Sequence, residues 1–154
     1  MEKIKINIGN FEESNNNSSL WSTINIEINE QVFPSKLWSD AASAVLEMWA
    51  HNLCGLILGS VNRCNLDFMD GDYSIQLNSN NNHEVTATCI DPHNNVVISA
   101  TIDLLYFARQ ILRASEKMKL FYTDHSDSRA LNSLMYEVDK LRHIAGKYKL
   151  PTDT

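Results

Sequence analysis

The sequence contains few of the residues that build the commonest catalytic sites. It has five glycines in 154 residues, and no GxGxxG, GxxxxGK(S/T), HExxH or GxSxG pattern occurs in it. A loop that cradles phosphate groups therefore has little to be built from, and a strand-to-helix nucleophile elbow is missing. These absences disfavour an enzyme, and we expect neither catalytic residues nor a cofactor.

Cysteine is also scarce, and Cys54, Cys64 and Cys89 show no CxxC spacing. An odd number of cysteines without metal-ligand spacing predicts reduced thiols that pack as small apolar side chains. Reduced thiols are typical of the cytoplasm. The first residues alternate polar and apolar instead of forming a secretory leader, so we expect a cytoplasmic protein.

Long hydrophobic runs are missing as well. The longest, Leu53–Leu58, is interrupted by Gly55 and is far shorter than the roughly 20 residues that span a bilayer. Hydrophobic residues nevertheless make up 44% of the chain, which is enough for a core of its own. We expect a single domain over residues 1–148, a frayed tail over 149–154, and no membrane partner.

Basic residues are rare in most of the chain. Residues 1–108 carry four of them against thirteen acidic residues, whereas residues 109–154 carry nine against six. An acidic region of this size repels nucleic acid and attracts cationic protein surfaces. We therefore expect a basic protein as partner. A basic stripe could touch phosphates, but we interpret it as solvated helix faces with favourable contacts at helix C-termini; its residues are Arg109, Arg113, Lys117, Lys140, Arg142, Lys147 and Lys149.

Period-two alternation of apolar residues predicts six strands. They cover residues 4–8, 20–28, 64–68, 73–77, 85–89 and 96–102. Asp70-Gly71 lies between the third and fourth of these strands, and this dipeptide is typical of a tight hairpin turn. The asparagine-rich segments between other strands are expected to be loops.

Apolar residues at helical spacing predict three helices. The first is expected after Ser35 as cap and ends at Gly59, with Trp38 and Trp49 on its buried stripe. The second starts at the capping residue Asp103, and the third ends at Gly146. The order ββαββββαα predicts an α+β fold with a single, mostly antiparallel sheet and helices on one face.

The polar face of such a sheet is the candidate site. The residues that we expect there for contact with a partner are Trp21, Glu27, Asp67, Asp70, Asp72, Tyr73 and Glu84. Carboxylates attract a cationic partner, and large aromatic residues commonly anchor protein contacts. Two other interpretations of Asp67, Asp70 and Asp72 stay open, namely a solvated acidic turn and a site for a divalent cation.

Histidine offers three weaker candidates. His51 with Cys54, and His83 with Asp91 and His93, resemble ligand sets but match no zinc spacing. Asp124 and His125 could pair as a general base. An alternative function is therefore a metal-dependent hydrolase or nucleotide-modifying enzyme, and another is a structural or adaptor protein that associates with itself.

Three segments carry a resemblance to a known group of proteins. The first runs from Val32-Phe33-Pro34 to Trp49, the second is Leu66–Ile75 with its Asp-Gly turn, and the third is Ile102-Asp103-Leu104 with the helix that follows. In these segments the chain resembles small bacterial immunity proteins of contact-dependent growth inhibition and related polymorphic toxin systems. The matched residues specify a fold more than an activity.

The resemblance implies a non-enzymatic cytoplasmic protein that binds one cognate toxin domain. Such toxins are often basic nucleases, and the immunity protein occludes the active site. No catalytic residue is carried over from the family. The acidic charge of residues 1–108 agrees with this expectation, because it would steer encounter with a cationic toxin.

Overall fold

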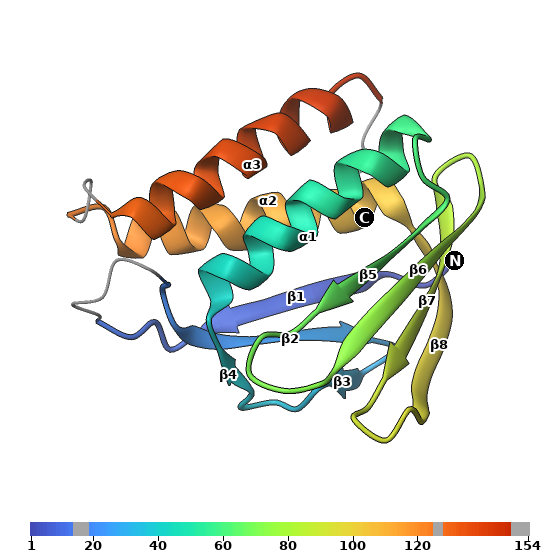
Figure 1. Cartoon of the computed structure of the whole chain (residues 1–154), viewed down its shortest axis with the longest axis horizontal. Helices are drawn as coiled ribbons and strands as arrows, with labels where there is room; N and C mark the ends of the chain where they lie inside the picture. Colours follow the sequence, from blue (N-terminus) through green and yellow to red (C-terminus); the bar gives the residue numbers. More distant parts are fainter. Residues whose placement is uncertain (14–18, 125–127, 149–154) are drawn as a thin grey trace.

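The helices and strands assemble into layers. α3 packs against α1 and α2, and the two sheets lie on the other side of these two helices (Figure 1). The computed structural model describes residues 1–13, 19–124 and 128–148. The elements of these residues are β1 (Ile4–Gly9), β2 (Ser22–Ile28), β3 (Gln31–Phe33), β4 (Ser39–Asp40), α1 (Ala42–Leu58), β5 (Arg63–Asp67), β6 (Ser74–Asn81), β7 (Glu84–Ile90), β8 (Val96–Asp103), α2 (Leu104–Phe121) and α3 (Arg129–Ala145). The predicted α+β class is confirmed. The tail that we predicted to fray lies outside the described residues.

The first sheet consists of β1 to β4. β2 is its centre, because β1 pairs along one edge while β3 and β4 pair with different parts of the other edge. The isoleucines Ile4, Ile24, Ile26 and Ile28 are fully buried, as their alternation predicts. The predicted inward face of the first two strands is therefore confirmed.

The second sheet is the antiparallel meander β5-β6-β7-β8. Its four strands correspond to the last four predicted strands, and the predicted hairpin around Asp70-Gly71 joins β5 to β6. Since the strands alternate in direction, the β5–β6 and β7–β8 turns lie at one end of this sheet and the β6–β7 turn lies at the other.

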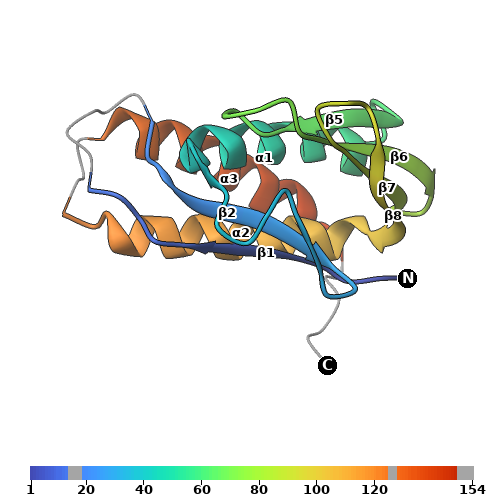
Figure 2. The same ribbon diagram turned by 90° about the horizontal axis from the view of Figure 1, so that it is seen from below.

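The prediction of one continuous sheet is wrong, because the described strands form two sheets. The two sheets are linked among the described residues by a single parallel bridge between Glu2, which precedes β1, and Ile102 of β8. β8 ends at Asp103, and α2 begins at the next residue. The Ile6 N–H of β1 therefore donates to Gln110 Oε1 on α2 and not to a neighbouring strand. The helix occupies the space that a longer pairing of β1 with β8 would need. Figure 2 shows the first sheet beside α2 and the second beside α1.

The first helix starts later than predicted. α1 begins after Ala41, and Ser35 does not cap it. Trp38 therefore precedes the helix and is half-buried, so its predicted place on the helical stripe is wrong. The other predicted boundaries are confirmed, because Gly59 ends α1 with a left-handed φ of 77° and the Asp103 side chain accepts the Tyr106 N–H at the start of α2.

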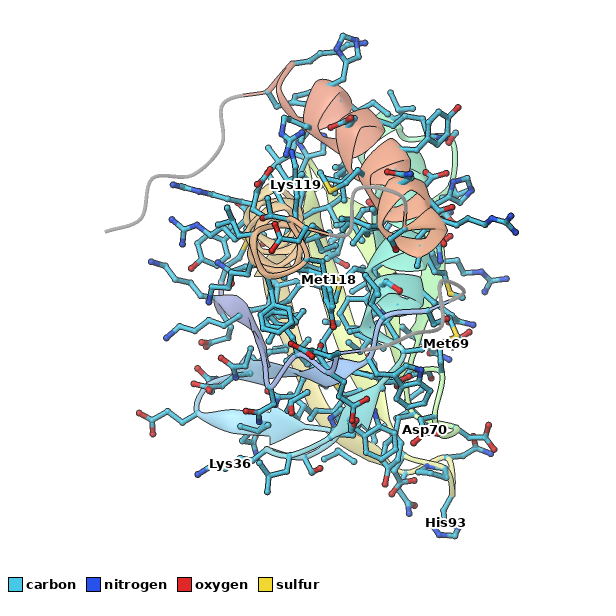
Figure 3. The ribbon with its side chains drawn as sticks, turned by 90° about the vertical axis from the view of Figure 1, so that its left-hand side faces the viewer. Lys36, Met69, Asp70, His93, Met118 and Lys119 are labelled. Atoms are coloured by element: carbon cyan, nitrogen blue, oxygen red, sulfur yellow. The ribbon has the colours of Figure 1, made fainter. Side chains whose placement is uncertain are left out.

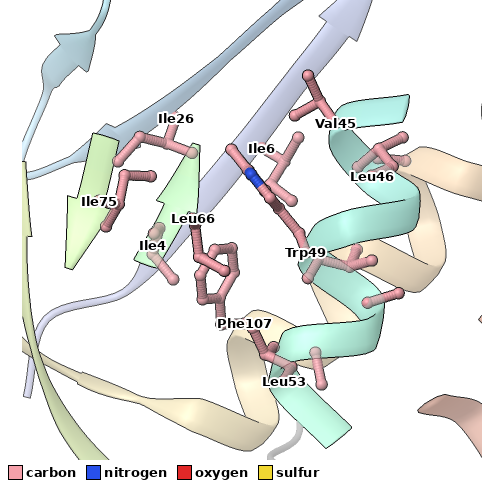
Figure 4. Close-up of a cluster of buried hydrophobic side chains, with 14 of the residues drawn as sticks. Ile4, Ile6, Ile26, Val45, Leu46, Trp49, Leu53, Leu66, Ile75 and Phe107 are labelled. Atoms are coloured by element: carbon pink, nitrogen blue, oxygen red, sulfur yellow. The ribbon is translucent and has the colours of Figure 1, made fainter. Parts of the chain in front are cut away.

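One set of buried side chains joins both sheets to the helices (Figure 4). Trp49 of α1 is fully buried at its centre, with its ring edge-on to Phe107 of α2 at a centroid distance of 6.1 Å. Trp49 is thus a core residue, as predicted. None of the described helices combines the length and apolar character needed to cross a membrane.

Side chains of α1 cover the outer edge of β5. Asn52 Nδ2 donates to the Asn65 carbonyl oxygen at 3.0 Å, and Trp49 Nε1 donates to the Asp67 carbonyl oxygen at 2.9 Å. An open strand edge is a template for pairing with another chain, and covering it blocks that pairing. Self-association through β5 is therefore disfavoured.

Candidate protein-binding surface

The segment between β5 and β6 gathers acidic residues at one place, and we call residues 67–73 the acidic turn. Asp67, Asp70 and Asp72 are exposed in it, and Tyr73 is half-buried. Four of the seven predicted site residues therefore lie within one hairpin turn. In Figure 3, Asp70 lies near the edge of the molecule, well away from Lys119 on α2.

Aromatic side chains join the acidic turn to the core. The Tyr73 ring lies edge-on to Trp38 and Phe33, with centroid distances of 5.0 and 5.6 Å. Phe68 lies edge-on to Trp38 at 6.4 Å and to Trp49 at 5.2 Å. Such pairs contribute about 0.5–1.5 kcal/mol each beyond their burial. The turn is therefore held against the core instead of projecting freely into solvent.

Asp40 is the residue of this site that sequence reasoning missed. Its side chain is fully buried and accepts hydrogen bonds from Trp38 Nε1 at 2.9 Å, Ala41 N at 2.7 Å and Met69 N at 2.9 Å. One carboxylate thus ties the segment before α1 to the acidic turn. Its place just before a run of helix-forming residues is a signal that could have identified it as a structural residue.

Gly71 allows the turn to lie close to Trp38. A Cβ atom at Gly71 would be 3.0 Å from Trp38 Cη2 and 3.4 Å from Tyr73 Cδ2. Real Cβ atoms rarely come so close to a packed ring, so a side chain at this position would displace one of the two contacts. The glycine therefore lets the loop between β5 and β6 pack closely on Trp38.

The carboxylates of the acidic turn are not neutralised within the described part of the chain. Asp67, Asp70 and Asp72 form no ion pair and no side-chain hydrogen bond there. Asp91 differs, because it accepts hydrogen bonds in its own loop, chiefly from the Asn95 N–H, and these hold its pKa below the ordinary value. The acidic turn thus presents negative charge that the fold itself does not use.

Exposed apolar side chains accompany this charge. Met69, within the turn, is 41% exposed, and Leu37, next to Trp38, is 79% exposed. Val96 and Val97 are exposed at the neighbouring β7–β8 turn, at the same end of the second sheet. Methionine and aromatic residues beside a polar rim are typical of surfaces that contact other proteins.

The other three predicted site residues lie elsewhere. Glu27 is on the outer face of the first sheet, opposite Lys5 of β1. Trp21 is half-buried just before β2. Glu84 begins β7, at the end of the second sheet away from the acidic turn. The prediction that all seven residues share one sheet face is wrong, because the strands belong to two sheets.

The predicted metal and catalytic sets gain no geometric support. Within residues 1–13, 19–124 and 128–148, no three His, Cys, Asp or Glu side chains are grouped so as to hold a metal ion. His83 and His93 lie beyond opposite ends of β7, which separates them by about 20 Å. The pair Asp124 and His125 cannot be described, since His125 lies outside the described residues.

The three cysteines are free thiols. Burial raises the pKa of Cys64 to about 11 and that of Cys89 to about 12. Burial, and secondarily the nearby Glu137 carboxylate, also raise the pKa of Cys54. Since the thiolate is the reactive form, these cysteines are poor nucleophiles at neutral pH, as expected for packing residues.

The fold and surface define an α+β protein with two antiparallel sheets, three described helices and an acidic turn at one end of the second sheet. Comparison of the chain with known protein families, curated proteins and solved structures found no match. The resemblance to immunity proteins therefore stays a prediction from the sequence.

Proposed function

We propose that this chain is an immunity protein that binds a basic toxin domain in the cytoplasm and occludes its active site. The observation that carries the proposal is the acidic turn, in which three carboxylates have no partner among the described residues and are mounted on a loop that is packed against the core. The proposed role is binding, without catalysis by this chain.

Electrostatics supports this role. Charges that are already fixed in place attract an oppositely charged surface over several ångströms and raise the rate of encounter. The packing of Tyr73 and Phe68 on Trp38 and its aromatic neighbours fixes the turn before binding, so less conformational entropy is lost on association. Met69 and Leu37 supply apolar area beside the charges. A basic nuclease domain, which binds phosphates through its own cations, has the complementary surface.

The proposed contact surface contains fewer residues than we predicted from the sequence. Asp67, Asp70, Asp72 and Tyr73 form it, whereas Trp21, Glu27 and Glu84 lie outside it. Glu27 and Glu84 contribute to the overall negative field, which acts on the rate of encounter more than on the lifetime of the complex.

The test uses the toxin domain encoded immediately upstream of this chain. The two purified proteins should form a stable complex, and the chain should protect cells that express the toxin. The double variant Asp70→Lys, Asp72→Lys should lower the association rate constant about tenfold or more at low salt, because it reverses two charges at the contact.

The matched control is the double variant Glu2→Lys, Glu30→Lys, since both glutamates are exposed and lie at the first sheet, outside the acidic turn. Stopped-flow measurements at several salt concentrations separate the two variants. Equal effects of the double variant and of two such remote substitutions would show a nonspecific field. A chain that neither binds nor protects would refute the proposal.

A further inference from the structure

A second surface with unpaired carboxylates lies where the chain leaves β1 beside α2 (Figure 1). β1 ends at Gly9 and is followed by Phe11, Glu12 and Glu13, while α2 ends at Phe121. We call Phe11, Glu12, Glu13 and Phe121 the aromatic patch. None of these four residues belongs to the acidic turn or to the predicted site.

Two phenyl rings pack against each other in the aromatic patch. The ring centroids of Phe11 and Phe121 are 5.0 Å apart, and the ring planes differ by 28°. The Tyr122 ring lies edge-on to both, at centroid distances of 6.1 Å from Phe11 and 4.8 Å from Phe121. Tyr122 is fully buried, whereas Phe121 is 46% exposed. The buried tyrosine therefore holds the two rings in place, and part of the Phe121 ring is open to solvent.

Hydrogen bonds fix the segment that carries the two glutamates. The Glu12 N–H donates to the Trp21 carbonyl oxygen at 2.9 Å, and the Tyr122 hydroxyl donates to the Glu12 carbonyl oxygen. The segment after β1 is thus tied both to the chain that leads into β2 and to the end of α2. Because it is held in place before binding, less conformational entropy is lost when a partner associates.

The carboxylates of the patch are not neutralised by the described part of the chain. Glu12 and Glu13 are exposed, and their side chains form no ion pair and no hydrogen bond there. Burial raises the pKa of Tyr122, and the nearby Glu12 and Glu13 carboxylates raise it further. Among the described residues, no cationic side chain lies over the ring of Phe11 or Phe121. Negative charge therefore lies beside an exposed ring that no cation of this fold covers.

The C-terminal end of α2 adds to this negative potential. α2 is 18 residues long and ends at Phe121. The last carbonyl groups of a helix carry a partial negative charge of about half an electron charge and attract cations. The phenyl rings, the two carboxylates and the helix end therefore favour the same kind of ligand group, which is a cation.

We propose that the aromatic patch binds an arginine side chain in a basic segment of a partner protein, with the guanidinium group stacked on the exposed part of the Phe121 ring and hydrogen-bonded to Glu12 or Glu13. A guanidinium group is planar and has five N–H donors, so it can cover a ring and reach a carboxylate at the same time. A lysine ammonium group is a compact, more strongly hydrated charge without a planar face. This assignment does not depend on the proposed toxin binding.

The experiment records amide NMR spectra of the isotope-labelled full chain during titration with the peptide acetyl-Arg-Gly-Arg-amide in about 0.15 M NaCl, where diffuse surface charge is screened. Saturable shifts are expected at the amides of Phe11, Glu12, Glu13 and Phe121. The same peptide with lysine in place of arginine should bind about threefold or more weakly, because it lacks the planar group.

One pair of variants tests the contribution of the ring. Phe121→Leu keeps an apolar side chain but removes the aromatic face, so it should weaken binding of the arginine peptide about fivefold or more. Tyr136→Leu is the matched control, since Tyr136 is an aromatic residue of α3 that is 65% exposed. The control should leave the affinity within about twofold of that of the original protein. The dispersion of the amide spectrum shows whether each variant is folded.

A second pair tests the contribution of the carboxylates. The double variant Glu12→Gln, Glu13→Gln should weaken binding about tenfold or more, because both charged acceptors are lost. The double variant Asp70→Asn, Asp72→Asn makes the same charge change at the acidic turn and should alter the affinity about twofold or less. All four side chains are exposed, so both variants should fold.

Several results would overturn the proposal. The first is the absence of saturable shifts at the aromatic patch up to about 10 mM peptide. Equal losses of affinity in the two double variants would show that the peptide responds only to the overall charge. A lysine peptide that binds as tightly as the arginine peptide would exclude stacking of a guanidinium group. Shifts centred on the acidic turn would assign the basic segment to that surface and not to the aromatic patch.

Discussion

The acidic turn is built differently from the groove between β1, α2 and α3. We call the latter the basic groove, and its lining includes Arg109, Arg113, Glu116, Lys117 and Arg142. The turn is a short loop whose carboxylates have no partner in the described structure, while its backbone and aromatic residues are packed on the core. The groove lies between regular elements, and its cation Arg142 is engaged with Glu116 and Asp139. In the acidic turn, aromatic residues hold the loop in place and the aspartates carry the charge. In the basic groove, Arg142 both carries charge and links α2 to α3 through Glu116.

This difference matters for how each surface responds to substitution. We expect that charges at the acidic turn can be changed without loss of the fold, because Asp67, Asp70 and Asp72 have no ion pair or side-chain hydrogen bond with any other described residue. The residues beneath it, above all Asp40, cannot be changed so freely, because several donors depend on one carboxylate. Three substitutions test whether residues that stabilise the fold are distinct from residues that only carry surface charge.

The largest effect is expected for Asp40→Ala. Trp38 Nε1–H and the backbone N–H groups of Ala41 and Met69 would lose their acceptor in a buried place. The free energy of unfolding should fall by about 3–5 kcal/mol, measured by urea denaturation. Asp70→Ala is the control and should change it by about 0.5 kcal/mol or less. Similar losses in both variants would show that the buried Asp40 carboxylate is no more important for stability than the exposed Asp70 carboxylate.

A smaller loss is expected for Gly71→Ala. The new Cβ would lie 3.0 Å from Trp38 Cη2, so the turn or the ring must shift. We expect a loss of about 1–2 kcal/mol in thermal or urea unfolding. Gly9→Ala is the matched control, because a Cβ at Gly9 meets no atom within 4 Å. If both variants have the same stability, the packing of the turn on Trp38 is not a significant constraint.

The smallest effect is expected for Arg142→Ala at the basic groove. The ion pairs of Arg142 are solvent-exposed, with 45% of its side-chain surface accessible. Exposed pairs contribute about 1 kcal/mol or less, and salt weakens them further. Urea denaturation at low and high salt should show a loss within that range that shrinks as salt is added. A loss above about 2 kcal/mol at high salt would make this arginine a structural residue of the groove.

Much of the fold followed from local patterns in the sequence. Alternating isoleucines marked β1 and β2, Asp-Gly marked the β5–β6 hairpin, and Asp103 and Gly59 marked helix ends. β3 was missed because its hairpin uses Asn29 and Glu30, both with positive φ, in place of the usual Asn-Gly. The break between the two sheets was missed because it depends on where α2 packs, which no local pattern encodes.

The candidate site was predictable only in part. The sequence singled out Asp67, Asp70, Asp72 and Tyr73, because they are adjacent in the chain. It also grouped Glu27 and Glu84 with them, since strand order cannot be deduced from alternation alone. The sequence also grouped Arg142 with the cations of α2, on charge alone. That these residues line one groove depends on how α3 packs against α2, which the sequence pattern does not encode.

The placement of Trp38 gives the molecule a built-in optical sensor. Its indole lies edge-on to Tyr73 and Phe68 and directly beneath the glycine of the hairpin tip. Any macromolecule that settles over that tip changes the polarity around a natural fluorophore without any dye being attached. Trp49 is sealed in the interior, and replacement of the half-buried Trp21 by Phe removes the other variable emitter, so that the emission wavelength then reports occupancy of this end of the molecule through Trp38.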